Sequence, residues 1–386
     1  MQHIYLDNAA TTPMAPAVVE AMTNQMQNDF GNASSSHWFG RTAHTELDAA
    51  RKTIAQSINA KPDDIIFTSG ATEANNTAIK TVAHAMASKG KHIITTAIEH
   101  PSVLESMKAL EREGFNVTYL PVSETGELEL ADFDAALDDD TILVSVMMGN
   151  NEVGSRLPIK EIGERLVDHQ ALFHTDATQT YGLYDIDVDA LHVDFLSTSA
   201  HKINGPKGVG FLYRRPGYKL LPFMNGGEQE KKRRAGTENV AGIVGMAKAV
   251  SLLTPEVKAK HQADFYGFKQ QLLKQLDDAG IDYALNGSLK PDNPNHVLNL
   301  WLKGLSTYAL QTNLDLAGFA ISGGSACTAG SLEPSHVLIA MFGKDSPRIG
   351  ESIRVSFGTY TTAEEVQAFG VALIKIANRL HARAKK

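Results

Sequence analysis

The stretch IIFTSGATEANNTAIKTVAHAM, residues 65–86, decides the fold, because it has the pattern of a buried strand that runs into a helix. Three apolar residues, 65–67, are followed by small and hydroxylated residues. Ala74, Ala78 and Val82 then recur at four-residue steps, which places one apolar face on a helix. We therefore expect a strand–turn–helix unit over this stretch.

The same pattern recurs between residues 64 and 214, where short apolar runs alternate with helical segments. The further runs are 92–96, 116–120, 142–146, 171–174, 195–197 and 209–213. All of them, like 65–67, are typical of buried strands. Strand–helix alternation of this kind predicts a largely parallel sheet with helices on both faces.

A second region begins after Thr254-Pro255, where the composition changes. A polar helical segment, about 256–279, leads to further strands near 297–302, 319–322 and 353–357. A last helix carries apolar residues at three- and four-residue steps from Val366 to Leu380. We expect a large domain of residues 14–255, and a smaller domain made of residues 1–13 and 256–386.

Composition narrows the class of protein. The chain has 386 residues, 43% hydrophobic and 21% charged, as expected of a soluble globular protein with two α/β domains. A net charge of −8 argues against stable binding to nucleic acid or membrane, and the basic run 231–234 is typical of a solvated loop.

No secretory signal and no run of about 18 apolar residues is present, which predicts a cytoplasmic protein. The single cysteine, Cys327, excludes a disulfide framework and an all-cysteine metal site, and no metal is predicted.

Two strand ends offer groups that bind a ligand, because ligands of open α/β sheets gather at the carboxyl ends of the strands. The segment 68–75 supplies a helix start and the Thr72 hydroxyl, which together could hold an anion. Ser69 or Thr72 could instead simply cap the helix. Asp176 follows the run at 171–174, where it could cap a helix or hold a protonated heterocyclic nitrogen.

A third strand end offers an amine. Lys202 follows the run at 195–197 and precedes the turn Gly205-Pro206-Lys207-Gly208. A desolvated lysine at the mouth of a crevice forms imines with aldehydes, and local sequence leaves Lys207 as the alternative. An anion site, a carboxylate for a ring nitrogen and an amine for an aldehyde are the three groups that pyridoxal 5'-phosphate (PLP) requires.

The residues of these segments, and the order in which they occur, resemble those of the cysteine desulfurases of the NifS/IscS-like group, which are PLP-dependent members of the class V aminotransferase family. The resemblance runs from 5–13 to 352–356, and includes HKINGPKG at 201–208, RAGTEN at 234–239 and GSAC at 324–327. It implies the PLP-dependent transferase fold (fold type I): a large domain with a mostly parallel seven-stranded sheet, and a smaller αβ C-terminal domain.

The resemblance also implies a role for individual residues. Lys202 would bind the cofactor aldehyde, Asp176 the pyridine nitrogen and Gln179 the phenolic oxygen, while His100 would stack on the ring and relay protons. The groups implied for the phosphate are the Ala71 amide, Thr72, Ser199, His201 and, from a neighbouring subunit, Thr237. A homodimer with composite sites follows from the last of these. Asn151 and Arg354 would hold the substrate carboxylate.

Several of these residues have a purely structural alternative. His100 could cap a turn, and His201 could be a buried, hydrogen-bonded histidine. Arg354 alternates with apolar residues, as an outward-facing strand arginine would. For His37 and Arg41, a structural role and a place in the site are equally open.

Cys327 selects among the reactions that PLP supports. It lies in a run of small residues, 322–330, that offers little to a core and is typical of a mobile loop. The implied reaction converts L-cysteine to L-alanine and leaves the sulphur on Cys327 as a persulfide, with His100 as candidate acceptor of the thiol proton. A sulphur-acceptor protein, in iron–sulphur cluster assembly or tRNA thiolation, would then take it.

Two other functions remain open at this point. One is a different PLP enzyme of the same fold, such as an aminotransferase or a selenocysteine lyase; an aminotransferase would need no cysteine on such a loop. A non-catalytic sulphur-carrying scaffold would not need Lys202 and Asp176 together with Cys327. The sequence does not identify the sulphur acceptor.

Overall fold

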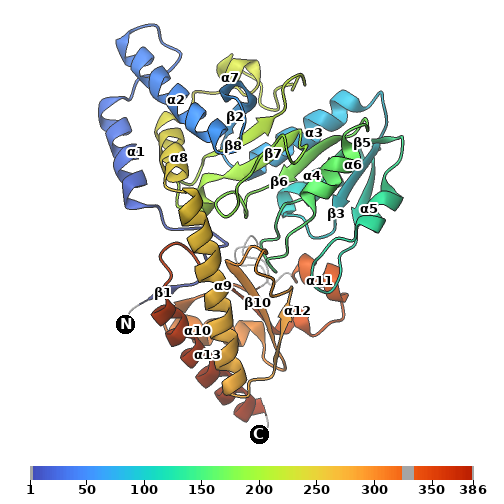
Figure 1. The fold of residues 1–386 in the computed structure, drawn as a ribbon, viewed down its shortest axis with the longest axis vertical. Coiled ribbons are helices and arrows are strands. Elements are labelled where there is room, and N and C mark those ends of the chain that lie inside the picture. The colour runs from blue at the N-terminus through green and yellow to red at the C-terminus, as the bar shows by residue number, and fades with distance from the viewer. Residues whose placement is uncertain (1–2, 324–333, 385–386) are drawn as a thin grey trace.

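The computed structural model describes residues 3–323 and 334–384. Its centre is a seven-stranded sheet in the order β2-β8-β7-β6-β5-β3-β4 (Figure 1). The strands are β2 (Ile65–Thr68), β3 (His92–Thr96), β4 (Asn116–Leu120), β5 (Thr141–Ser145), β6 (Leu172–Asp176), β7 (Phe195–Ser199) and β8 (Gly210–Arg214). Only β8 runs antiparallel to its neighbours, so the predicted, mostly parallel seven-stranded sheet is confirmed.

One of the predicted strands lies in a different setting from the one expected. The sequence predicts β4 as a buried strand, and this is wrong: Asn116 is exposed and only Leu120 is buried. β4 forms the edge of the sheet and pairs with β3 alone. An edge strand lacks a neighbour on one side, so its side chains stay partly accessible there.

Helices pack against this sheet. The helix α3 (Ala71–Met86) follows β2 and buries Ala74, Ala78 and Val82, which confirms the predicted strand–turn–helix unit. The other helices of this region are α1 (Pro16–Asn28), α2 (Trp38–Gln56), α4 (Pro101–Arg112), α5 (Leu130–Ala136), α6 (Ile159–Leu166), α7 (Gln229–Lys232) and α8 (Val240–Ser251). Short 3-10 turns lie at Pro62–Asp64 and Ala200–Lys202.

The C-terminal region has its own sheet and core, drawn in orange and red in Figure 1. An antiparallel sheet β12-β10-β9 packs with long helices, and β1 pairs in parallel with β11. Its elements are β1 (Ile4–Tyr5), α9 (Pro255–Asp278), β9 (Tyr283–Asn286), β10 (Val297–Leu302), α10 (Thr307–Leu316), β11 (Phe319–Ala320), α11 (His336–Phe342), α12 (Arg348–Glu351), β12 (Ser352–Ser356) and α13 (Ala363–Ala384). The smaller αβ C-terminal part is thereby confirmed, while the exact division at residues 13 and 255 stays a prediction.

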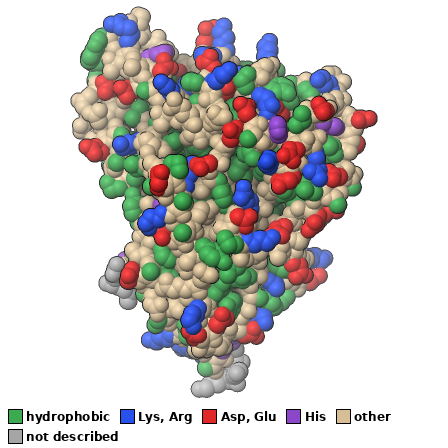
Figure 2. All heavy atoms as spheres, in the orientation of Figure 1, with side chains coloured by type: hydrophobic (Ala, Val, Ile, Leu, Met, Phe, Trp, Pro, Cys, Tyr) green, Lys and Arg blue, Asp and Glu red, His purple; other side chains and the backbone are tan. Residues whose placement is uncertain are grey.

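Charged side chains of both signs are interspersed over the face drawn in Figure 2. The basic run 231–234 is likewise accompanied by acidic side chains: Lys231 pairs with Asp63, Lys232 with Glu228 and Arg234 with Glu73. Over residues 3–323 and 334–384, no single helix has the length and apolar character to cross a membrane. The helices α8 and α9 reach that length and apolar character only when taken together, and the chain bends by 75° between them.

Candidate active site

A cavity of about 930 Å³ opens where β6, β7 and the start of α3 meet. It is lined by most of the residues predicted from the sequence: Ala71, Thr72, His100, Asn151, Asp176, Gln179, Ser199, His201, Lys202 and Arg354. Such a volume is typical of a site for a cofactor-sized ligand. Thr237 is not among the lining residues, and Cys327 lies outside the described residues.

The start of α3 forms one wall of this cavity. Gly70 precedes the helix with a φ of 148°, and within the described ranges no side chain caps this helix. The alternative that Ser69 or Thr72 caps the helix is therefore wrong. The first backbone N–H groups of a helix lack partners within it, so those of Ala71 and Thr72 suit an anion.

Asp176 is held in a fixed orientation at the end of β6. Asn75 Nδ2 donates to Asp176 Oδ2 (2.7 Å), and the Thr178 backbone N–H donates to Asp176 Oδ1 (2.9 Å). Asn75 also donates to Ser102 Oγ (2.9 Å) and is fully buried. Sequence reasoning missed Asn75, although a polar residue beside Ala74 on the apolar face of α3 is a signal that could have identified it.

The N-terminal segment lies against Lys202. The Lys202 ammonium donates to the backbone oxygens of Ala9 and, at 2.8 Å, Ala10. Ala9, Ala10 and Thr11 also line the cavity, and sequence reasoning gave them no role because backbone acceptors leave no side-chain pattern. Lys207 lines the same cavity, so position alone does not separate the two lysines.

Two histidines line the cavity as neutral rings. His100 caps α4, where its Nδ1 accepts from the Ser102 backbone N–H (3.1 Å), so that the predicted capping role and a place in the cavity both hold. Burial lowers the pKa of His100, and Lys202 lowers it further while Asp176 opposes. Burial and the charges of Lys202 and Lys207 lower the pKa of His201 to about 4.

Arg354 is buried, with 1% of its surface exposed, so the alternative of an outward-facing strand arginine is wrong. Its guanidinium donates to the Asn151 backbone oxygen (2.9 Å) and to Asp7 Oδ1 (2.9 Å). Its Nε has no hydrogen-bond partner in the part of the chain that the structure describes. A buried guanidinium with an unused donor suits a carboxylate ligand.

Three predicted candidates lie elsewhere. Thr237 lines a separate cavity of about 120 Å³, together with Arg234, which pairs with Glu73 at 2.8 Å. His37 caps α2 by accepting from the Gly40 N–H, and Arg41 donates to the Ser36 backbone oxygen. For His37 and Arg41 these contacts favour the structural alternative.

The donor set fits PLP on three counts. The uncapped start of α3 suits the phosphate, the Asp176 carboxylate suits a protonated ring nitrogen, and Lys202 suits the aldehyde. In the described part of the chain, Asn75 Oδ1 and Thr178 Oγ1 are buried without hydrogen-bond partners around Asp176. Such polar atoms are expected beside a ligand site, since buried polar groups are otherwise satisfied.

Glu99 lies behind His100 and is fully buried. Its Oε1 accepts from Thr96 Oγ1 and from the Met147 N–H, both at 2.8 Å, while Oε2 has no partner within residues 3–323 and 334–384. Burial raises the pKa of Glu99 to about 8, and the charge of Asp176 raises it too. The carboxyl is therefore mostly protonated at neutral pH.

Comparison with known proteins agrees with this geometry. Residues 4–369 match the aminotransferase class-V family. A Bacillus subtilis (strain 168) relative named IscS 1 is 52% identical over 380 residues, which cover 98% of this chain and 100% of that protein. The cysteine desulfurase IscS of Dictyoglomus turgidum is 46% identical over 379 residues, which cover 98% of this chain and 95% of that protein. A solved NifS-like protein superimposes with a TM-score of 0.89 at 36% identity, covering 98% of this chain and 100% of the other.

The raised pKa of Glu99 predicts a pH-dependent stability. Between the unfolded pKa of 4.5 and the folded value of about 8 the folded state binds the extra proton, so stability falls as pH rises across that window. The free energy of unfolding of the wild type, relative to Glu99→Gln, should fall by up to about 1.4 kcal/mol per pH unit. Urea unfolding at pH 5, 6.5 and 8 measures it. Glu105→Gln, on the exposed side of α4, is the control, and a difference that stays constant with pH contradicts the prediction.

Proposed function

We infer that this chain, which belongs to the aminotransferase class-V family and within it to the cysteine desulfurases, converts L-cysteine to L-alanine with PLP as cofactor. The observation that carries this conclusion is the single cavity in which Lys202, Asp176 and the uncapped start of α3 meet. Bound PLP supplies an electron sink that weakens the bonds of an attached amino acid.

The residues around the cavity divide the binding of PLP between them. The start of α3, Thr72, Ser199 and His201 would hold the phosphate, because they offer N–H and O–H donors at one end of the cavity. Asp176 would keep the ring nitrogen protonated, with its carboxylate oriented by Asn75. Its neighbours Gln179 and His100 would contact the phenolic oxygen and the ring face.

The substrate L-cysteine would be held by its carboxylate. Arg354 and Asn151 line the cavity, and the hydrogen bond from Arg354 to Asp7 fixes the guanidinium before the substrate arrives. Lys202, once released from the cofactor, would remove the proton from Cα of the substrate. The hydrogen bonds to the backbone oxygens of Ala9 and Ala10 would hold this amine while it is charged.

We propose that Cys327 receives the sulphur. Its thiolate attacks the sulphur of the substrate, an S–S bond forms as the Cβ–S bond breaks, and the bonding pair remains with Cβ, which takes up a proton. Alanine leaves, and Cys327 carries a persulfide. His100, whose ring is neutral, is the proposed acceptor of the thiol proton. Since Cys327 lies outside the described residues, this role rests on the sequence and on the relatives.

We propose that the chain acts as a homodimer. Thr237 does not line the cavity of its own subunit, which leaves it available to a second copy. Phe30, Trp38 and Phe39 are 67%, 60% and 44% exposed; the ring of Phe39 stacks on Phe30 (centroids 5.3 Å apart) and meets Trp38 edge to face (4.9 Å). Exposed aromatic clusters of this kind are typical of protein interfaces.

The proposed sulphur acceptor is a protein in the cytoplasm that serves iron–sulphur cluster assembly, with tRNA thiolation as the second destination. Support for a protein acceptor comes from the surface charge. The basic run 231–234 is paired with Asp63, Glu228 and Glu73, and mixed charges cover the face in Figure 2. Neither feature favours stable binding to nucleic acid.

Replacing the thiol tests the sulphur transfer. Cys327→Ala should keep the visible absorbance of the lysine-bound cofactor and lose alanine and sulphide formation from L-cysteine by more than about 100-fold, because the nucleophile is absent. Product assays without any added keto acid measure this and also exclude an aminotransferase. Full activity of Cys327→Ala contradicts the proposed role.

Two matched variants decide between the lysines. Lys202→Ala should lose the absorbance of the lysine-bound cofactor and all measurable turnover, whereas Lys207→Ala should keep the absorbance. Borohydride reduction followed by peptide mass spectrometry locates the modified lysine directly. Attachment of the cofactor at Lys207 would overturn the assignment.

The aromatic cluster predicts the oligomeric state. Trp38→Glu should shift the protein from dimer to monomer, because a charge cannot be buried in an apolar interface without a partner. Light scattering after size exclusion measures the mass. Val371→Glu is the control, because Val371 is 55% exposed on α13, and it should leave the dimer intact. A wild type that is monomeric at micromolar concentration contradicts the proposal.

A further inference from the structure

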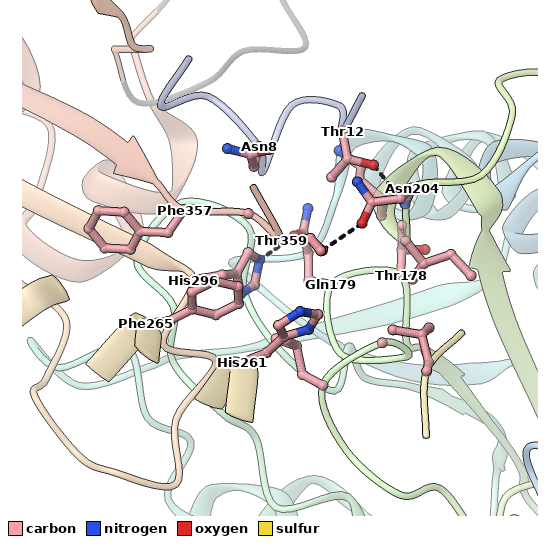
Figure 3. Close-up of a pocket in the computed structure, with 16 residues that line it drawn as sticks. Asn8, Thr12, Thr178, Gln179, Asn204, His261, Phe265, His296, Phe357 and Thr359 are labelled. Atoms are coloured by element: carbon pink, nitrogen blue, oxygen red, sulfur yellow. Dashed lines mark hydrogen bonds between the residues drawn. The ribbon is translucent and has the colours of Figure 1, made fainter. Parts of the chain in front are cut away.

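A second, smaller cavity of about 50 Å³ shares Lys202, Gln179 and Thr178 with the large one (Figure 3). Its other walls come from the C-terminal region, including His261 and Phe265 of α9 and His296, which precedes β10. Gln179 therefore lies in the partition between the two cavities. It can be contacted from the small cavity while it faces the cofactor site.

The hydrogen bonds of Gln179 fix which way its amide points. Gln179 Nε2 donates to the Ala9 backbone oxygen (3.2 Å), and His296 Nε2 lies 2.8 Å from Gln179 Oε1 (Figure 3). The Ala9 oxygen can only accept, so the amide nitrogen must face it. The amide oxygen then faces His296, which must donate from Nε2.

His296 is suited to donate from that nitrogen only. It is 7% exposed, and its Nδ1 has no hydrogen-bond partner among the residues that the structure describes. Burial, with the charges of Lys269, Lys202 and Arg354, lowers the pKa of His296 to about 3. The ring is therefore neutral, carries its proton on Nε2 and leaves Nδ1 bare.

We propose that His296 is a positioning residue for the cofactor site, which holds the amide of Gln179 so that its second N–H is presented to the phenolic oxygen of bound PLP. This rests on the proposed role of Gln179. An amide nitrogen has two donors, and Ala9 uses one. Without His296 only the bond to Ala9 orients the amide, and an amide that flips would point its oxygen at the phenolic oxygen and repel it.

The visible absorbance of the lysine-bound cofactor reports this contact in the holoenzyme. A donor to the phenolic oxygen stabilises its negative charge, so losing the donor makes the chromophore hold its proton more tightly. In His296→Leu the pH midpoint of the absorbance change should rise by about one unit. His296→Gln, which keeps an N–H, should restore a midpoint close to the wild type.

A matched substitution separates this role from simple packing. His261 lines the same small cavity and stacks on Phe265, and over the described residues it makes no hydrogen bond to Gln179. His261→Leu should therefore leave the midpoint unchanged. Equal shifts in His261→Leu and His296→Leu overturn the proposal, and thermal denaturation checks that each variant is folded.

A double-mutant cycle tests whether His296 acts through Gln179. Gln179→Leu should raise the midpoint by itself, and adding His296→Leu to it should cause no further rise. If Gln179→Leu causes no shift, the proposed role of Gln179 fails, and the inference with it. If Gln179→Leu shifts the midpoint and His296→Leu does not, only the positioning role of His296 is overturned.

Discussion

The contact between the Lys202 ammonium and the backbone oxygens of Ala9 and Ala10 is the interaction on which the site depends. A half-buried amine requires acceptors, and the N-terminal segment supplies them. That segment continues from β1, which is paired with β11 in the C-terminal region, while Lys202 follows β7 of the large sheet. One short set of hydrogen bonds thus joins the two sheets at the point where chemistry takes place, and the cavity exists because these parts meet there.

Around that contact the protein orients polar groups before any ligand arrives. Asn75 and the Thr178 N–H hold Asp176, Asp7 holds Arg354, and His296 holds Gln179. The rings of His100, His201 and His296, of which the first two are half-buried and the last is buried, have pKa values lowered by burial, so they act as neutral hydrogen-bonding groups. Groups fixed in this way need little reorganisation when charge develops on a bound molecule, which is the main electrostatic contribution of an enzyme site.

The sequence predicted the fold and most of the lining residues because their signals are local. Asp176 ends a strand, and Ala71, Thr72 and Lys202 follow strands closely, so that the strand ends bring them to one edge of the sheet. The predictions that failed or stayed open concern contacts between residues that are far apart in the sequence. Whether β4 lies at an edge depends on distant neighbours, and so did the choice between the two roles left open for Arg354, of which the cavity supports the place in the site. Ala9 and His296 were missed because a backbone oxygen and a partner more than 100 residues away leave no local pattern, whereas Asn75 left one on the apolar face of α3 that was not used. The role proposed for Thr237 requires a second subunit, which a single chain does not contain.

The antiparallel strand β8 has a consequence for what the site can accept. It lies between β2 and β7, with Gly210 opposite both Thr68 and Ser199, so two strand spacings, about 10 Å, separate the strand that leads into α3 from the strand that leads to Lys202. Backbone hydrogen bonds, rather than adjustable side chains, set that separation. The sheet therefore fixes how far apart the groups that follow β2 and β7 can lie when they contact the cofactor. A change that shifted the register of β8 against β2 or β7 would therefore move the groups that follow these strands relative to one another.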